Sequence, residues 1–294
     1  MAATASSGST AQVERIEIDL LLEAVFRFSA YDFRGYAPER LERRVRARLR
    51  KEGVASVSAL QERVLHEPES LEGLVQALSA APTGLFRAPG FFAALRRSVV
   101  PLLTTYPSVL VWNPACATGE EAVSLAILLE EAGLGDRVRI YATDISRAAL
   151  EAARRVRLPE AAREAAAARH LAAGGSGSLT RHFRRVGDDW QLRAELGERL
   201  LFAEHNLGTD RSFNEFNLVV CRTGLPNFGT PLRARAERVF YESLVPFGFL
   251  ALGSRDRRPG GRLGDCFEPV DGRWRVFRSI PGGGWRPADG SAPG

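Results

Sequence analysis

A repeated strand–turn–helix pattern near the middle of the chain limits the possible folds more than any other feature. Residues 109–112 form a short apolar run typical of a buried parallel strand, and a helical stretch follows over 120–131. A second strand is expected over 138–142, ending near Asp144, and a second helix over 146–155. This alternation favours an α/β fold in which helices cover a mostly parallel, Rossmann-like sheet.

Segments further along the chain extend the predicted sheet. Strands are expected at 216–221 and 249–252, with a helix over 232–244. Residues 179–199 contain short strand-like runs, so we expect a small antiparallel β insertion there. The tail 281–294 is rich in glycine and proline and is expected to lack regular structure.

One helix ahead of the sheet is unusually basic. Leu41, Val45 and Leu49 recur at four-residue spacing, which predicts a buried helix face, and Gly53 suits the end of that helix. The other positions of this helix carry most of its charge: Arg40, Arg43, Arg44, Arg46, Arg48, Arg50 and Lys51.

The expected domain boundaries follow changes in composition along the chain. Residues 1–12 are small and polar and are expected to be disordered. A small all-α domain is expected over 13–92, with two further short amphipathic helices at 58–65 and 69–78. The α/β domain is expected over 93–280.

The composition argues against several classes of protein. Hydrophobic residues make up 45% of the chain, but no run approaches the ~20 apolar residues of a membrane span. The first residues lack the apolar stretch of a secretory signal, so a cytoplasmic setting is expected. Cys116, Cys221 and Cys266 form no Cys-x-x-Cys pair, so we expect neither a disulfide framework nor a metal site. The net charge of +5 is compatible with an acidic partner or with nucleic acid.

The turn after the first strand is a candidate ligand site. Residues 113–121 are mostly small and include Gly119, so backbone N–H groups at the helix start can approach a ligand closely. A full Gly-x-Gly-x-x-Gly pattern is absent, and a plain tight turn is the alternative interpretation. Asp144 stands where a carboxylate commonly accepts hydrogen bonds from ribose hydroxyls, although it could instead cap the next helix. Together these features favour an adenosine-containing ligand.

In these and several further segments, the chain resembles the CheR-type chemoreceptor methyltransferases. That family uses S-adenosylmethionine to methylate glutamate side chains on bacterial chemoreceptors. The resemblance runs from about Ile16 to Arg278. It rests on segments in the family's order: Thr83-x-x-Phe86-Arg87, Trp112 with 117–121, 142–145, 205–207, Cys221-Arg222 and 267–272.

The resemblance implies a binding site for the methionine end of the cofactor. Thr83 and Arg87 would contact this end, and Arg87 would also lie near the transferring methyl group as the catalytic residue. Glu121 would bind the amino group of the cofactor. An arginine suits such a site because it stays charged and can pair with the incoming carboxylate, which is already ionised at pH 7.

The resemblance also implies a binding site for the adenosine end. Asp144 would hold the ribose, and Asn206 and Leu207 would border the adenine. Thr223 and Gly224 fall on further cofactor-contacting positions. The product would be S-adenosylhomocysteine.

The same resemblance implies the partners. The arginine-rich helix would face the cytoplasmic helices of a methyl-accepting chemoreceptor, and the 179–199 insertion would grip a receptor tail peptide, as it does in some members. Metal binding and membrane insertion are not implied.

The chain departs from the family pattern at positions around the expected site. Ala81 stands where the family has Asn, Thr223 replaces another Asn, and Asn227 replaces a Tyr held to sit beside the methyl group. Residues 253–256 replace Gly-His-Ser-Glu. These changes leave open a catalytically impaired relative that senses the cofactor or binds proteins. A nucleic-acid methyltransferase is a weaker alternative, because the Asn/Asp-Pro-Pro-aromatic motif and an aromatic, basic stripe are absent.

Overall fold

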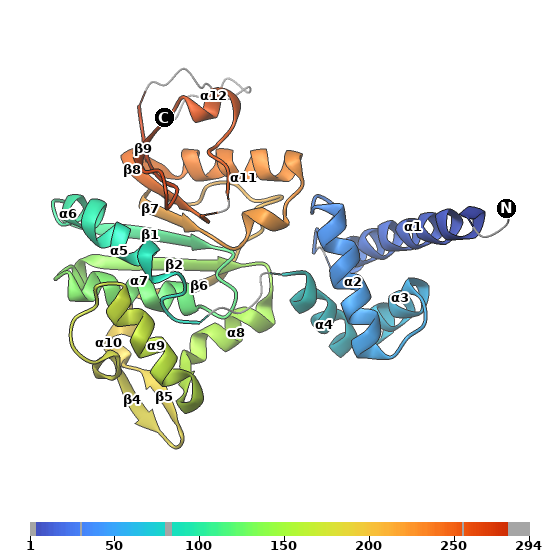
Figure 1. Cartoon of the computed structure of the whole chain (residues 1–294), viewed down its shortest axis with the longest axis horizontal. Coiled ribbons are helices and arrows are strands. Elements are labelled where there is room, and N and C mark those ends of the chain that lie inside the picture. The colour runs from blue at the N-terminus through green and yellow to red at the C-terminus, as the bar shows by residue number, and fades with distance from the viewer. Residues whose placement is uncertain (1–3, 30, 80–83, 255, 282–294) are drawn as a thin grey trace.

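The computed structural model of the chain describes residues 4–29, 31–79, 84–254 and 256–281. Figure 1 shows a helical bundle beside a larger body built around a sheet. The bundle consists of α1 (Thr4–Ser29), α2 (Pro38–Glu52), α3 (Val57–His66) and α4 (Pro68–Leu78). Its separate core includes Leu21, Val25, Leu60 and Leu74, all fully buried.

The basic helix forms as its sequence predicts. Leu41 and Val45 of α2 are buried, and Leu49 packs against the same core. Gly53 ends the helix in a left-handed conformation with φ of 69°, which glycine adopts without steric cost. Ser56 then caps α3 by accepting a hydrogen bond from the Ala59 N–H.

The N-terminus differs from expectation. The prediction that residues 1–12 are disordered is wrong for residues 4–12, which belong to α1. Extending an existing helix costs far less than starting one, because each added residue gains a hydrogen bond without a new nucleation step. This first part of α1 projects beyond the other helices (Figure 1). Residues 1–3 and 282–294 lie outside the described residues.

The sheet confirms the predicted α/β class. Its seven strands lie in the order β6-β2-β1-β7-β8-β10-β9. Pairing is parallel from β6 to β8, and β10 pairs antiparallel with both β8 and β9. The strands are β1 (Val109–Pro114), β2 (Val138–Asp144), β6 (Leu200–Glu204), β7 (Phe216–Cys221), β8 (Leu244–Leu252), β9 (Phe267–Asp271) and β10 (Val276–Ser279).

Helices cover both faces of this sheet. Neighbouring strand residues point to opposite faces, so Val111 joins one core cluster and Trp112 the other. The first cluster includes residues of α5 and α7, and the second includes residues of α11. The helices of this domain are α5 (Pro89–Ser98), α6 (Val100–Leu103), α7 (Glu120–Glu131), α8 (Arg147–Arg155), α9 (Glu160–Ala172), α10 (Ala194–Gly197), α11 (Thr230–Glu242) and α12 (Gly261–Gly264), with 3-10 turns at η1 (Gly135–Arg137), η2 (Leu179–His182) and η3 (Leu225–Asn227).

Two predicted boundaries need correction. Phe91 and Phe92 of α5 are buried in the α/β core, so this domain begins by Gly84 rather than at 93. The insertion is a three-stranded antiparallel sheet of β3 (Arg157–Pro159), β5 (Asp189–Leu192) and β4 (Phe183–Val186). The insertion therefore begins before residue 179, because β3 is one of its strands. The sequence did not reveal β3, since its partner β5 lies about 30 residues later in the chain and no local pattern links the two.

A buried ion network fastens α11 to the loop that follows β8. Arg233 is 8% exposed and donates to Glu237 at 2.7 Å and to Asp256 at 2.9 Å. Removing the arginine would leave two buried carboxylates without the cation that pairs with both of them. Among the described helices, none is both long and apolar enough to cross a membrane.

Candidate functional site

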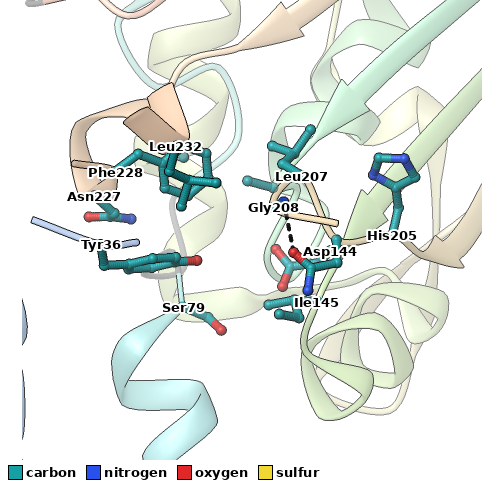
Figure 2. A pocket seen from close by; sticks show the side chains of 13 residues that line it. Tyr36, Ser79, Asp144, Ile145, His205, Leu207, Gly208, Asn227, Phe228 and Leu232 are labelled. Carbon is teal, nitrogen blue, oxygen red and sulfur yellow. Dashed lines mark hydrogen bonds between the residues drawn. The ribbon is translucent and has the colours of Figure 1, made fainter. Parts of the chain in front are cut away.

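A cavity lies where the helical bundle meets the carboxyl ends of β1 and β2. Such crevices are the usual ligand sites of open α/β sheets. Figure 2 shows Tyr36 and Ser79 on one side of this cavity and Asp144 on the other. The lining residues are Tyr36, Ser79, Ala115, Asp144, Ile145, His205, Asn206, Leu207, Gly208, Gly224, Asn227, Phe228 and Leu232.

The turn after β1 is backbone-strained. Ala115 and Ala117 adopt positive φ angles of 54° and 50°, which are uncommon for residues other than glycine. Cys116 between them donates its N–H to the Thr143 carbonyl at 3.0 Å, which ties the turn to the end of β2. Strain of this kind persists where surrounding structure enforces it and is frequent at ligand sites.

Asp144 is buried at the end of β2 with its charge partly satisfied. Its Oδ2 accepts a hydrogen bond from the Ala117 N–H at 2.9 Å, and its Oδ1 accepts one from the Ser146 N–H at 2.9 Å. Burial raises the pKa of this carboxyl above its ordinary value, and these N–H donors oppose the rise. Each oxygen keeps a lone pair for a further donor. Ser146, rather than Asp144, caps α8 by accepting from the Ala149 N–H.

The cavity lining beside Asp144 is less polar. Leu207 is buried and Ile145 lies in the same wall, so this part can accept a flat apolar ring. The Asn206 side-chain oxygen accepts from the Gly208 N–H at 2.8 Å, which fixes the amide and leaves its NH2 group available. Asn206 and Leu207 both line the cavity, and their contact with adenine stays a prediction.

Gly224 allows two loops to approach closely. A Cβ atom placed there would lie 2.7 Å from the Cβ of Ala115, too close for any real contact. Gly224 lines the cavity, whereas Thr223 lies beside it and donates its hydroxyl to the Ala115 carbonyl at 3.3 Å. Thr223 therefore braces the strained turn in this structure.

Glu121 belongs to a second, charged cluster next to the cavity. Its two oxygens accept from Arg222 Nη1 at 2.8 Å and from Asn113 Nδ2 at 3.0 Å. Burial raises the pKa of Glu121, and the positive charge of Arg222 opposes the rise. Arg222 also lies 4.2 Å from the ring centre of Phe91. Sequence reasoning missed Asn113 and the Arg222 contact, because nothing in the local pattern brings them to Glu121.

Arg87 stands at a rigid junction beside this cluster. Phe86 has a φ of 52°, and its N–H donates to the buried Ser124 hydroxyl at 2.8 Å. The carbonyl of Arg87 accepts from Arg222 Nη2 at 2.9 Å. The side chain of Arg87 is exposed, and its positive charge is one of the groups that oppose the burial-driven rise in the pKa of Glu121. Thr83 and Ala81 lie outside the described residues.

Asn227 is used for contact between the domains. Its Oδ1 accepts from Arg44 Nη2 at 3.1 Å, although the two residues are 183 positions apart in the chain. Arg44 also donates to the carbonyls of Leu78 and Ser79 at the end of α4. The sequence assigned no role to Tyr36 or Ser79, which reach the cavity only through this docking.

A cluster with metal-binding side chains lies elsewhere, on α7, α9 and η2. The ligand atoms of Glu131, His170 and His182 lie within 4.8 Å of one another. Arg96 and Arg181 also form ion pairs with Glu131. Their two positive charges already balance the carboxylate and would repel a metal cation. The cluster therefore fastens the insertion to α7.

Comparison with known proteins agrees with this architecture. Residues 81–276 match the SAM-binding domain of CheR methyltransferase, and residues 16–79 match its all-alpha domain. A methyltransferase-family protein named Cher3 from Pseudomonas putida is 40% identical over 90% of this chain and 96% of its own length. A chemotaxis protein methyltransferase from Listeria monocytogenes is 26% identical over 76% of this chain and 82% of its own length. A biofilm formation methyltransferase, WspC, from Pseudomonas aeruginosa is 26% identical over 72% of this chain and 50% of its own length.

The described residues fit S-adenosylmethionine. Asp144 keeps free acceptor capacity, Leu207 is a buried apolar lining residue, and Glu121 is a carboxylate, which are the kinds of group that a ribose, an adenine and an ammonium group would need. The matched domains span most of the chain in the expected order. This chain is therefore a member of the CheR methyltransferase family, with a SAM-binding α/β domain and an all-alpha N-terminal domain.

Proposed function

We propose that the chain methylates glutamate carboxylates on a helical protein partner, namely the cytoplasmic helices of a methyl-accepting chemoreceptor. S-adenosylmethionine supplies a methyl group activated by its positively charged sulfur. The nucleophile is a carboxylate that is ionised at neutral pH, so no strong base is needed. The task of the protein is to hold the two reactants in line at ~3–3.5 Å and to exclude water.

The observation that carries this proposal is a row of positive charges on α2, a helix that begins beside the cavity. Helix α2 begins two residues after Tyr36, which lines the cavity. In the part of the chain that is described, no ion pair engages these α2 cations: Arg40, Arg43, Arg50 and Lys51. By contrast, Arg46 pairs with Glu14, and Arg48 pairs with Glu52. The free row suits an acidic helical partner.

Arg87 supports the same chemistry. Its exposed guanidinium lies near the charged cluster of Glu121 and Arg222. An arginine can form a bidentate pair with a substrate carboxylate, donating one hydrogen bond to each oxygen, and so hold the carboxylate against the cofactor. We assign Arg87 this catalytic positioning, with Thr83 and Thr223 as further cofactor contacts expected from the family pattern.

A receptor tail peptide would bind at the insertion. In the order β3-β5-β4 the strand β4 has a free edge, to which an extended peptide can add as another strand. Arg184 and Arg185 of β4 are exposed and favour an acidic peptide.

Transfer of labelled methyl groups to receptor-containing membranes tests the proposal. We expect label that mild base releases as methanol, because carboxylate methyl esters are base-labile. Changing Arg43→Glu should slow transfer at least tenfold and leave S-adenosylhomocysteine affinity unchanged. Arg46→Gln is the matched control on the same helix and should have little effect. Bound cofactor without any transfer would refute glutamate methylation.

A second candidate function rests on Asn227. Its amide is committed to Arg44, so it strengthens the contact between the domains. This arrangement favours a cofactor-sensing or protein-interaction module, as does the relation to proteins named for functions other than chemotaxis. Binding of receptor that depends on S-adenosylmethionine but yields no methyl ester would support this candidate.

A further inference from the structure

Two hydroxyl groups of the helical domain face the cofactor cavity with no partner assigned to them. Tyr36 lies between α1 and α2, and Ser79 follows α4. Both line the cavity, opposite Asp144 (Figure 2). Because they come from a different domain than Asp144, their role depends on how firmly the domains are held together.

The Tyr36 segment is fastened to the α/β domain by backbone hydrogen bonds. The Ala37 N–H donates to the Asn227 carbonyl at 2.8 Å, and the Gly229 N–H donates to the Gly35 carbonyl at 2.8 Å. Tyr36 and Phe228 form an antiparallel bridge between these bonds, with their ring centres 5.1 Å apart. These contacts leave little freedom for the Tyr36 ring and direct it toward the cavity.

The Tyr36 hydroxyl is a permanent donor at neutral pH. No hydrogen bond to this hydroxyl is found among the described residues. Burial and the negative charge of Asp144 both raise the pKa of Tyr36, so the phenol stays protonated.

Ser79 provides an independent observation. Ser79 is 5% exposed, and its buried Oγ has no hydrogen-bond partner among the described residues. Its backbone is fixed at both ends, since its N–H donates to the Val75 carbonyl at 2.9 Å and its own carbonyl accepts from Arg44 at 2.9 Å. A buried hydroxyl without a hydrogen bond destabilises the fold, and a ligand in the adjacent cavity would satisfy it.

We propose that Tyr36 and Ser79 hydrogen-bond the ribose hydroxyls of S-adenosylmethionine from the side opposite Asp144. The chemistry is complementary. Asp144 can only accept, so each ribose hydroxyl donates to it and presents its own lone pairs to other donors. Tyr36 and Ser79 supply those donors. The helical domain thereby completes the ribose subsite, and cofactor affinity depends on its docking. This inference concerns the cofactor and is independent of the substrate proposed above.

Calorimetric titration of the full chain with S-adenosylhomocysteine tests the proposal. Tyr36→Phe keeps the ring packing on Phe228 and removes only the hydroxyl. Tyr36→Phe and Ser79→Ala should each lower affinity about threefold to tenfold, which is the contribution of one neutral hydrogen bond. Tyr31→Phe is the matched control, because Tyr31 lies in the same loop without lining the cavity, and its affinity should equal that of the unchanged protein.

Deoxyribose analogues separate direct contact from a general disturbance of the cavity. With the 2′-deoxy or the 3′-deoxy form of S-adenosylhomocysteine, the affinity difference between Tyr36→Phe and unchanged protein should vanish for the form that lacks the bonded hydroxyl. Equal weakening of the parent ligand and both analogues would overturn the proposal. Affinities of both variants within twofold of the unchanged protein would also overturn it. Methyl transfer is not measured, so failure here is distinct from failure of the proposed substrate.

Discussion

Replacing Asp144 by asparagine tests the ribose subsite most directly. The substitution preserves the size of the side chain but turns one acceptor oxygen into an NH2 group. Both carboxylate oxygens already accept backbone N–H groups at 2.9 Å, so the NH2 must face a donor or the cavity. The variant therefore loses acceptor capacity where ribose hydroxyls are expected to donate.

The expected magnitude follows from the number of hydrogen bonds lost. A hydrogen bond to a charged group contributes about 1.5–3 kcal/mol. Loss of one such bond and weakening of a second amounts to about 3 kcal/mol, or roughly a hundredfold in Kd. Calorimetric titration with S-adenosylhomocysteine measures this change, and thermal unfolding of the same sample checks that the fold persists.

Glu204 offers a matched control. It pairs in register with Asp144 on the neighbouring strand β6, but it is exposed and bonds Arg147. Glu204→Gln should change Kd less than threefold, since exposed ion pairs contribute little. An affinity for Asp144→Asn within about threefold of the unchanged protein would refute the assignment of Asp144 to the ribose.

Three further predictions follow from the contacts described above. Gly224→Ala places a Cβ atom 2.7 Å from the Cβ of Ala115. The variant should lower the free energy of unfolding by about 1–3 kcal/mol, measured by chemical denaturation, and should weaken cofactor binding. An unchanged denaturation midpoint would contradict the close approach of the two loops. Arg233→Met leaves two buried carboxylates unpaired, and should cost about 3–5 kcal/mol in the same assay, with part of the loss recovered at low pH where the carboxylates are protonated. Burial lowers the pKa of His182 below its ordinary value, so the unfolded chain binds the proton more readily than the folded one. The free energy of unfolding should therefore fall as pH drops through about 6.5. His182→Gln should reduce this dependence of stability on pH, and an unaltered dependence would refute the prediction.

Local patterns of the sequence predict much of the architecture. The strand before the turn, the helix Glu120–Glu131 and the strand ending at Asp144 all form where apolar periodicity predicts them. Short buried strands and amphipathic helices are recognisable because their side chains repeat over a few residues. The sequence pattern alone therefore predicts that Asp144 lies at the ligand edge of the sheet.

Contacts between distant segments escaped prediction. Arg222 reaches Glu121 from 101 positions away, and Arg44 reaches Asn227 from 183 positions away. The strand β3 could not be recognised either, because three residues carry no periodic signal and gain order only by pairing with β5. Such features depend on which surfaces meet after folding.

The sequence alone determined the α/β class, the all-alpha N-terminal domain and the place of Asp144 at the end of a strand. Only the tertiary structure decided that Tyr36 and Ser79 face Asp144 across one cavity. The physical reason is that secondary structure depends on neighbours along the chain, whereas a ligand subsite depends on the docking of whole domains. In this chain the helical domain docks on the α/β domain through a few hydrogen bonds around Asn227 and Gly229. No pattern in the sequence predicts these bonds.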